Sequence, residues 1–250
     1  MRIASSSLAA RVASVVLFFV IWEAAARLAA SRQLPPATMV ILTLASEIAH
    51  GGMFHHLAMT LLRVLLSFVL AMSIGTVIGF LMGRWRAVDA ALDSWVLLLL
   101  NLPALVVTVL AYIWFGLTEV AAIGAVALNK LPLVVVTLRE GVRALDRDFA
   151  DMARVFRLSA WRRVRHIIMP QLSPFLIVAA RSGLSLIWKI VLVVELLGRS
   201  DGVGFQIQLY FQLFDVARVL AYTIAFVAII QAIEWAILQP IERHVARWRR

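Results

Sequence analysis

Long apolar runs separated by short polar segments dominate this chain. A membrane-spanning helix needs about 20 consecutive apolar residues, and segments of roughly that length occur at residues 12–30, 57–82, 91–113, 118–138, 174–197 and 218–240. These runs are continuously apolar, which favours helices over the alternating strands of a membrane barrel. The pattern therefore predicts an all-α integral membrane protein with about six transmembrane helices, all within one domain, 1–250.

The polar segments between these runs differ in charge. Arginines gather in 83–90 and 139–173, near the first residues and in the tail 243–250, whereas 31–56 and 198–217 hold few. Basic residues flank membrane spans on the cytoplasmic side, so we expect both termini to be cytoplasmic. The same rule accounts for the net charge of +10, and no nucleic-acid partner is expected.

The first apolar run has an alternative interpretation. Arg2, Arg11 and the small residues 24–26 around it also fit a cleavable secretory signal peptide. The run continues to Ala30, which is longer than the apolar core of most signal peptides. We therefore expect it to remain as a span.

The cytoplasmic segment 139–173 carries two amphipathic patterns. Phe149, Met152, Ala153 and Phe156 fall at helical spacing and predict one short helix. Ser159 is a candidate N-cap for a second helix, which carries Trp161, Val164 and Ile168 on one face and is expected to end at Pro170. Such a basic amphipathic pair suits either an anionic lipid surface or a partner protein.

The order of residues in this segment resembles the EAA loop of ABC importer permeases. The matching elements are Asp151-Met152-Ala153, then Arg157 after three residues, then Ile167-Ile168-Met169-Pro170. Other elements resemble the nitrate/sulfonate/taurine branch of these permeases over about residues 34–248: Leu34-Pro35-Pro36, Thr60, Arg63, Trp114-Phe115-Gly116, Glu119, and the run from Glu195 to Phe205 with Gly202 and Gly204.

Several residues depart from that family pattern. Asp151 replaces Glu, Met152 replaces a small residue, and Arg157 replaces the turn glycine. The turn therefore either needs no positive φ or strains Arg157. Lys130 stands where the branch usually has an apolar or aromatic residue, and a proline usual near Val109 is absent. The changes within the spans leave the substrate open.

The resemblance implies the permease subunit of an ATP-driven importer in the bacterial inner membrane. It would form the path for a small, anionic solute of the sulfonate, nitrate or taurine kind, delivered by a periplasmic binding protein. Expected partners are a second copy of the permease, two ATP-binding cassette subunits and membrane lipid. The residues expected to contact the ATPase are Phe149, Asp151, Met152, Ala153, Phe156, Arg157, Leu158, Ser159 and Trp161.

The chain has no G-x-x-x-x-G-K-[ST] loop to cradle ATP phosphates. We therefore expect ATP and Mg²⁺ on the partner ATPase, with no cofactor and no enzyme activity in this chain. Two alternatives stay open: the same importer type for a neutral heterocycle, such as a pyrimidine-like vitamin precursor, and an ion-coupled secondary transporter.

Polar residues within the spans are candidates for the translocation path, because charges at membrane depth usually face an aqueous route or a partner. On the fifth span, polar side chains fall within an arc of about 140° at 100° per residue. The expected path residues are Lys130, Ser185, Trp188, Lys189 and Asn101. The expected structural or gating residues are Arg63, Arg181, Glu195, Gly202 and Gly204.

Lys130 and Lys189 are the only lysines, and both are expected near the midplane, where they would favour an anion. In the competing interpretation Glu195 or Glu234 neutralises them, and the path suits a neutral solute. Glu195 and Arg181 are expected to pair with neighbouring helices. The five histidines form no metal-ligand pattern, and His55 with His56 is expected in a solvated turn.

Overall fold

The structure is a computed structural model and describes residues 2–240. Its helices in chain order are α1 (Arg2–Ala29), α2 (Ala37–Ala49), α3 (Met53–Arg84), α4 (Arg86–Asn101), α5 (Ala104–Phe115), α6 (Glu119–Arg143), α7 (Arg147–Val155), α8 (Ala160–Arg163), the π-helical turn η1 (Val164–Ile168), α9 (Met169–Gly198), α10 (Val203–Gln212), α11 (Val216–Ile233) and the π-helical turn η2 (Glu234–Leu238). No strand occurs between residues 2 and 240. The tail arginines Arg243, Arg247, Arg249 and Arg250 lie outside the described residues.

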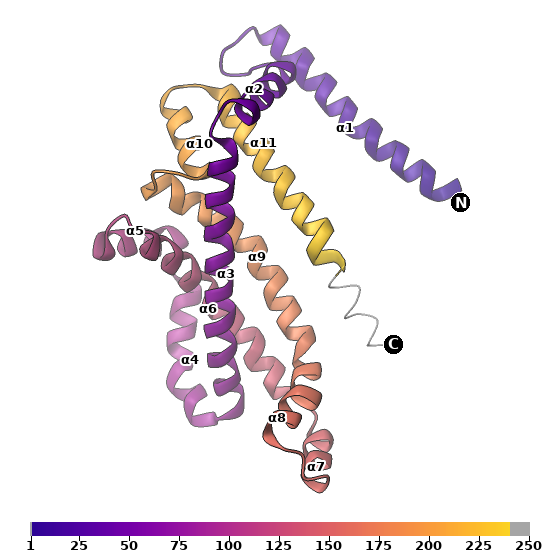
Figure 1. The fold of residues 1–250 in the computed structure, drawn as a ribbon, viewed down its shortest axis with the longest axis vertical. Coiled ribbons are helices and arrows are strands. Elements are labelled where there is room, and N and C mark those ends of the chain that lie inside the picture. The colour runs from indigo at the N-terminus through magenta and orange to yellow at the C-terminus, as the bar shows by residue number, and fades with distance from the viewer. Residues whose placement is uncertain (1, 241–250) are drawn as a thin grey trace.

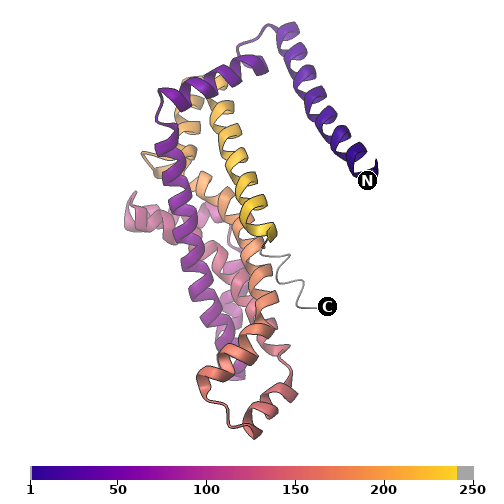
Figure 2. The same ribbon diagram turned by 45° about the vertical axis from the view of Figure 1, so that its right-hand side comes forward.

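Helices α3, α6 and α9 form the centre of the bundle, and α6 contacts both of the others (Figure 1). α4 packs against α3 and α6, while α2, α10 and α11 gather at the opposite end. α1 contacts α2 and diverges from the rest of the bundle (Figure 2). Its apolar residues from Val15 to Ile21 are exposed in the isolated chain, as expected for a helix surrounded by lipid or a partner.

The close contact between α3 and α6 depends on glycines spaced four residues apart. A Cβ at Gly75 would lie 2.7 Å from Cβ of Val134, and one at Gly79 would lie 2.6 Å from the Val135 carbonyl oxygen. Within a membrane, apolar side chains gain little by leaving lipid, so helices associate through such small-residue packing. The spacing of small residues therefore sets how closely these two spans approach.

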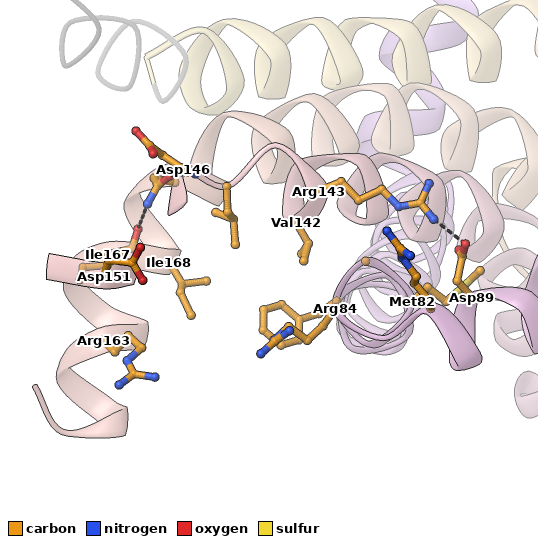
Figure 3. A pocket seen from close by; sticks show the side chains of 15 residues that line it. Met82, Arg84, Asp89, Val142, Arg143, Asp146, Asp151, Arg163, Ile167 and Ile168 are labelled. Atoms are coloured by element: carbon orange, nitrogen blue, oxygen red, sulfur yellow. Dashed lines mark hydrogen bonds and ion pairs between the residues drawn. The ribbon is translucent and has the colours of Figure 1, made fainter. Parts of the chain in front are cut away.

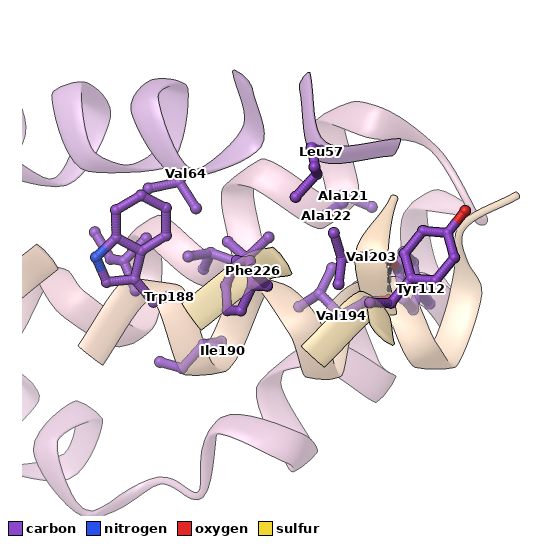
Figure 4. Packing of buried hydrophobic residues seen from close by; sticks show 14 of the residues in the cluster. Leu57, Val64, Tyr112, Ala121, Ala122, Trp188, Ile190, Val194, Val203 and Phe226 are labelled. Atoms are coloured by element: carbon purple, nitrogen blue, oxygen red, sulfur yellow. Dashed lines mark hydrogen bonds between the residues drawn. The ribbon is translucent and has the colours of Figure 1, made fainter. Parts of the chain in front are cut away.

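The main apolar core lies where α9 meets α3, α5, α6 and α11 (Figure 4). Trp188 packs edge-on against Phe226, with their ring centroids 6.0 Å apart. The hydroxyl of Tyr112 is buried but donates to the Val194 carbonyl at 2.9 Å. Its polar group is thus satisfied within the apolar region, where an unpaired hydroxyl would be costly.

Among the described residues, four helices are long and apolar enough to cross a membrane: Met53–Arg84, Glu119–Arg143, Ala160–Gly198 and Val216–Ala236. The prediction of one continuous helix over 91–113 is wrong, because α4 and α5 meet there at 100°, as in a broken span or a re-entrant loop. Pro103 disfavours helical geometry in the residue before it, and Leu102 is extended at φ −73°, ψ 126°. The length, composition and periodicity of the apolar run did not distinguish one straight helix from this bent pair.

The predicted stop at Pro170 is also wrong. Ser159 does cap a helix, since its hydroxyl accepts the Arg162 N–H at 3.5 Å, but the helical path continues through Pro170 into α9. The π-helical turn 164–168 precedes the proline, and such turns accommodate irregular hydrogen bonding. Ser173 donates to the Pro170 carbonyl at 2.8 Å, satisfying an acceptor that Pro174 cannot pair with.

The loops expected on the cytoplasmic side lie together at one end of the bundle, here called the inner end. Residues of the α3–α4 turn, the end of α6 and the segment α7–α8–η1 line one cavity there. At the other end, the outer end, Arg218 of α11 donates to Glu47 of α2 at 2.9 Å. The grouping of the loops agrees with the predicted sidedness, while the placement of the termini stays a prediction.

Candidate functional site

The segment α7–α8 projects from the inner end of the bundle (Figures 1 and 2). Ala153 is fully buried, whereas the larger apolar side chains on the segment are exposed. Those exposed side chains are Phe149, Met152, Val155, Phe156 and Trp161. Exposed apolar groups this close together are typical of a protein or membrane contact.

Arg157 forms the turn between α7 and α8 in the left-handed region, at φ +49°. The Leu158 N–H donates to the Ala153 carbonyl at 2.9 Å across this turn, as at many helix ends that use glycine. Of the two interpretations of Arg157, the structure selects backbone strain, because a non-glycine residue is disfavoured here. Asp151 and Leu158 belong to the same segment, but Asp151 is exposed and Leu158 is half-buried.

A cluster of charged side chains closes the outer end. Arg63 of α3 is buried, and it donates to Glu119 through Nε at 2.9 Å and Nη2 at 2.7 Å. Its Nη1 donates to Glu195 at 2.7 Å, and Nη2 also bonds to the Asp201 carboxylate. Arg199 donates to the same Glu119 at 2.6 Å. One guanidinium thus joins α3, α6, α9 and the α9–α10 loop through charge-assisted bonds.

Glu195 links this cluster to the start of α10. Its Oε2 accepts the Thr60 hydroxyl and the Gly204 N–H, both at 2.9 Å. The Thr60 oxygen in turn accepts the Val203 N–H at 2.8 Å. A carboxylate at a helix N-terminus satisfies free N–H groups and favours the helix dipole. Gly202, at φ +104°, leaves room for this carboxylate, since a Cβ there would overlap it.

Asp201 lies in the α9–α10 loop at the edge of the cluster. Burial acts to raise the pKa of Asp201, but the hydrogen bond and charge of Arg63 outweigh it and hold that pKa below its usual range. Asp201 therefore stays ionised and keeps its bond to Arg63 well into mild acid.

His56 belongs to the same end and corrects the expectation of a solvated turn. It lies on the first turn of α3, and its Nδ1 accepts the Gly202 N–H at 3.1 Å. Its Nε2 lies 2.5 Å from the Gln206 amide nitrogen. His55 beside it is mostly exposed. Between residues 2 and 240, no group of three acidic, cysteine or histidine side chains could hold a metal ion.

The two lysines occupy different surroundings. Lys130 of α6 is fully buried against Gly183 of α9, and its ammonium nitrogen is 3.4 Å from the Ser182 hydroxyl. Lys189 is exposed on α9, and so is Ser185. No hydrogen bond or ion pair joins Lys189 to the part of the chain that the structure describes.

The carboxylates proposed to neutralise the lysines bind arginines instead. Glu195 pairs with Arg63, and Glu234 pairs with Arg181 at 3.2 Å. Among the described residues neither carboxylate bonds to a lysine, so the interpretation that they neutralise the path is not supported. Trp188, expected on the path, is buried in the apolar core.

Asn101 lies at the end of α4, where its side chain donates to the Leu97 carbonyl at 2.7 Å. Sequence reasoning missed the hydrogen bonds and ion pairs made by Thr60, Asp201 and His56. A sequence signal existed, because these residues, Arg63 and Glu195 all lie near the outer ends of predicted spans. Which of them pair could not be read from spacing, because the partners are more than 130 positions apart in the chain.

Known proteins resemble this chain in sequence and in fold. Residues 75–238 match the family of binding-protein-dependent transport system inner membrane components. The aliphatic sulfonates transport permease protein SsuC of Bacillus subtilis is 31% identical over 216 residues, 86% of this chain and 78% of that protein. The taurine transport system permease protein TauC of Escherichia coli is 28% identical, over 93% of this chain and 86% of its own.

Solved structures with the same fold include an amino acid ABC transporter with histidines, with a TM-score of 0.59 and 20% identity. The match covers 82% of this chain and 96% of that one. The inward-facing MetNI methionine ABC transporter has a TM-score of 0.60 and 17% identity, over 78% and 94% of the two chains. At these identities the structures support the fold, and the sequence relatives support the family. The chain belongs to the binding-protein-dependent transport system inner membrane components, as an ABC importer permease of the sulfonate and taurine branch.

Proposed function

We propose that two copies of this chain form the translocation path for a small anionic solute with a sulfonate-like or other oxyanion group. The observation that carries the proposal is the polar face of α9, where Lys189 is exposed beside Ser185 without a partner in the described chain. A cation at membrane depth is costly and is retained where it faces an aqueous path or an anion. Relatives named for sulfonates, taurine and bicarbonate agree with an anionic solute.

The energy source is a separate ATPase that docks on α7–α8. Phe149, Met152 and Phe156 offer an apolar surface at the inner end, and the neighbouring arginines suit acidic edges on a partner. In this arrangement two ATP-binding cassette subunits carry ATP and Mg²⁺, and a periplasmic binding protein delivers the solute at the outer end. The assembly belongs in a bacterial inner membrane.

The test is substrate-dependent ATPase activity of the complex reconstituted with its binding protein. Taurine, an alkanesulfonate, nitrate and bicarbonate are compared with a neutral pyrimidine at equal concentrations. Stimulation by one or more of the anions, with none by the pyrimidine, supports the proposal. Stimulation by the pyrimidine alone would establish a neutral substrate. Uptake by the permease without ATPase subunits, driven by an ion gradient, would establish secondary transport.

A further inference from the structure

A cavity of about 1030 Å³ opens at the inner end between the α3–α4 turn, the end of α6 and the segment α8–η1. Arg163 of α8 and Arg84 at the end of α3 lie on opposite sides of it (Figure 3). Met82, Val142 and Ile167 are buried apolar residues of its lining. Its volume lies at the upper limit for small-molecule sites, and its lining combines apolar, cationic and acidic groups.

Three carboxylates also line the cavity, and one of them, Asp89, is paired with arginines. Asp89 binds Arg143 at 2.5 Å and Arg139 at 3.4 Å. The Asp146 carboxylate accepts the Asp148 N–H at 2.9 Å, and Asp151 also takes part in an interaction.

Three lining arginines are not neutralised in this way. Arg84 and Arg86 are exposed, and no ion pair joins either of them to residues within 2–240. Arg163 has a buried Nε for which the described chain offers no hydrogen-bond acceptor. The cavity is therefore lined by three arginines that carry no ion pair within the described residues, and guanidinium groups match phosphate geometry well.

The position of the cavity indicates what kind of anion reaches it. Trp85, between Arg84 and Arg86, is half exposed, and tryptophan gathers at the membrane–water interface. Both α3 and α6 end beside the cavity, at the level expected for lipid headgroups. Basic pockets at helix ends on the cytoplasmic side are suited to anionic lipid headgroups.

We propose that this cavity binds the headgroup of an anionic phospholipid from the inner leaflet. The phosphate lies among Arg84, Arg86 and Arg163, and the acyl chains leave along the apolar residues at the membrane side. The bound lipid joins the ends of α3 and α6 to the segment that carries α7 and α8. The site is separate from the exposed apolar face of α7, so it does not require that face to contact the ATPase.

The experiment uses the purified transporter complex and native mass spectrometry. Phosphatidylglycerol and phosphatidylcholine are titrated onto the wild type, the Arg84→Gln/Arg86→Gln variant, the Arg84→Lys/Arg86→Lys variant and Arg163→Gln. Arg32→Gln, at an exposed outer position, is the matched control. Each basic residue near a membrane surface contributes about 1 kcal/mol to binding anionic lipid, or roughly 5-fold. The double glutamine variant should therefore bind phosphatidylglycerol about 25-fold more weakly.

The other variants have distinct expected results. The lysine variant should retain most of the affinity, Arg163→Gln should lose about 5-fold, and Arg32→Gln and all phosphatidylcholine titrations should not change. Unchanged phosphatidylglycerol binding in the double glutamine variant would overturn the proposal. Displacement of the lipid by equimolar inorganic phosphate would instead show a site for a soluble anion. Loss of the ATPase subunits with unchanged lipid binding would assign the arginines to the partner protein.

Discussion

At the scale of single residues, Arg63 has a structural role that its contacts define. It is buried, and its five bonds reach Glu119, Glu195 and Asp201. Replacing Arg63 with Met would leave the Glu195 carboxylate buried without its cation. Breaking a buried pair in this way costs about 3–5 kcal/mol, which corresponds to a fall of about 6–20 °C in Tm. The measurement is thermal unfolding of the purified complex.

A control separates this loss from the general effect of removing an arginine. Arg27 forms an exposed pair with Glu23 at 2.7 Å, and exposed pairs contribute little to stability. Arg27→Met should therefore leave Tm nearly unchanged. Adding Glu195→Gln to Arg63→Met should recover part of the loss, because the uncompensated charge is removed. Equal Tm values for Arg63→Met and Arg27→Met would contradict the buried role of Arg63.

Gly202 is the second residue with a specific requirement. Its φ of +104° disfavours any side chain, and a Cβ would overlap the Glu195 carboxylate. We expect Gly202→Ala to lose about 1–3 kcal/mol from backbone strain alone, with a further loss from displacing Glu195. Gly124→Ala is the matched control, since no atom lies within 4 Å of a Cβ there. Chemical denaturation of both variants in detergent should show a loss only at Gly202.

Sequence reasoning identified most of the charged residues at the outer end but few of their contacts. Arg63 and Glu195 stood out because ionised groups within apolar runs need partners. Their pairing depends on how α3 lies against α9, which follows from side-chain packing across the whole bundle and not from local periodicity. Thr60 and His56 lie near the outer ends of predicted spans, but their type did not indicate a partner, because hydroxyl and imidazole groups at helix ends are common and usually bind water.

At the scale of elements, apolar run length predicted the long helices α3, α6, α9 and α11 well. It failed at α4–α5, where the helix direction changes at Pro103 within a largely apolar run. The expected helix end at Pro170 was also wrong. The proline suggested an end, but the chain stays helical after a π-helical turn. Beside Pro174, the Ser173 hydroxyl donates to the carbonyl that the missing proline N–H leaves free, and the helix continues there.

The segment α7–α8 supplies the prediction at this scale. Phe156 is 71% exposed in the isolated chain, so its burial would come from a partner. Burying a Phe side chain contributes about 1.5–3 kcal/mol, and Phe156→Asp should lower co-purification of the ATPase by at least about 10-fold. Phe214→Asp changes a still more exposed Phe at the outer end and should leave co-purification unchanged. If both variants retain the ATPase, the segment lies on lipid instead.

At the scale of the whole molecule, one chain presents a polar path face on α9 without enclosing it. Arg181, Ser185 and Lys189 are exposed on the isolated chain, and the apolar residues of α1 are exposed as well. A second copy facing α9 would enclose the polar residues, while lipid would cover the apolar ones. This division of the surface is why we expect a two-fold assembly, and a native mass with one permease copy per complex would contradict it.

The two lysines contribute differently to the charge of the enclosed path, because Lys189 is exposed and Lys130 is buried. Lys189→Met removes the exposed ammonium while keeping a side chain of similar length, so uptake of an anionic solute should fall at least about 10-fold, the effect of a contact of about 1.4 kcal/mol. Lys189→Arg keeps the charge and should retain most of the uptake. Both variants should assemble and hydrolyse ATP at the basal rate, because Lys189 has no partner within the described chain whose loss would destabilise it.

Lys130 is the informative comparison, because it is buried between α6 and α9. In the conformation described here it cannot contact a solute, so Lys130→Met should affect uptake only if transport separates these two helices and exposes the ammonium. Uptake assays on the two methionine variants, run beside their basal ATPase rates, distinguish the cases. Loss in both variants indicates that the α6–α9 contact opens during transport, and loss in Lys189→Met alone indicates a path on the exposed face of α9. Wild-type uptake in both would remove the basis for an anionic substrate.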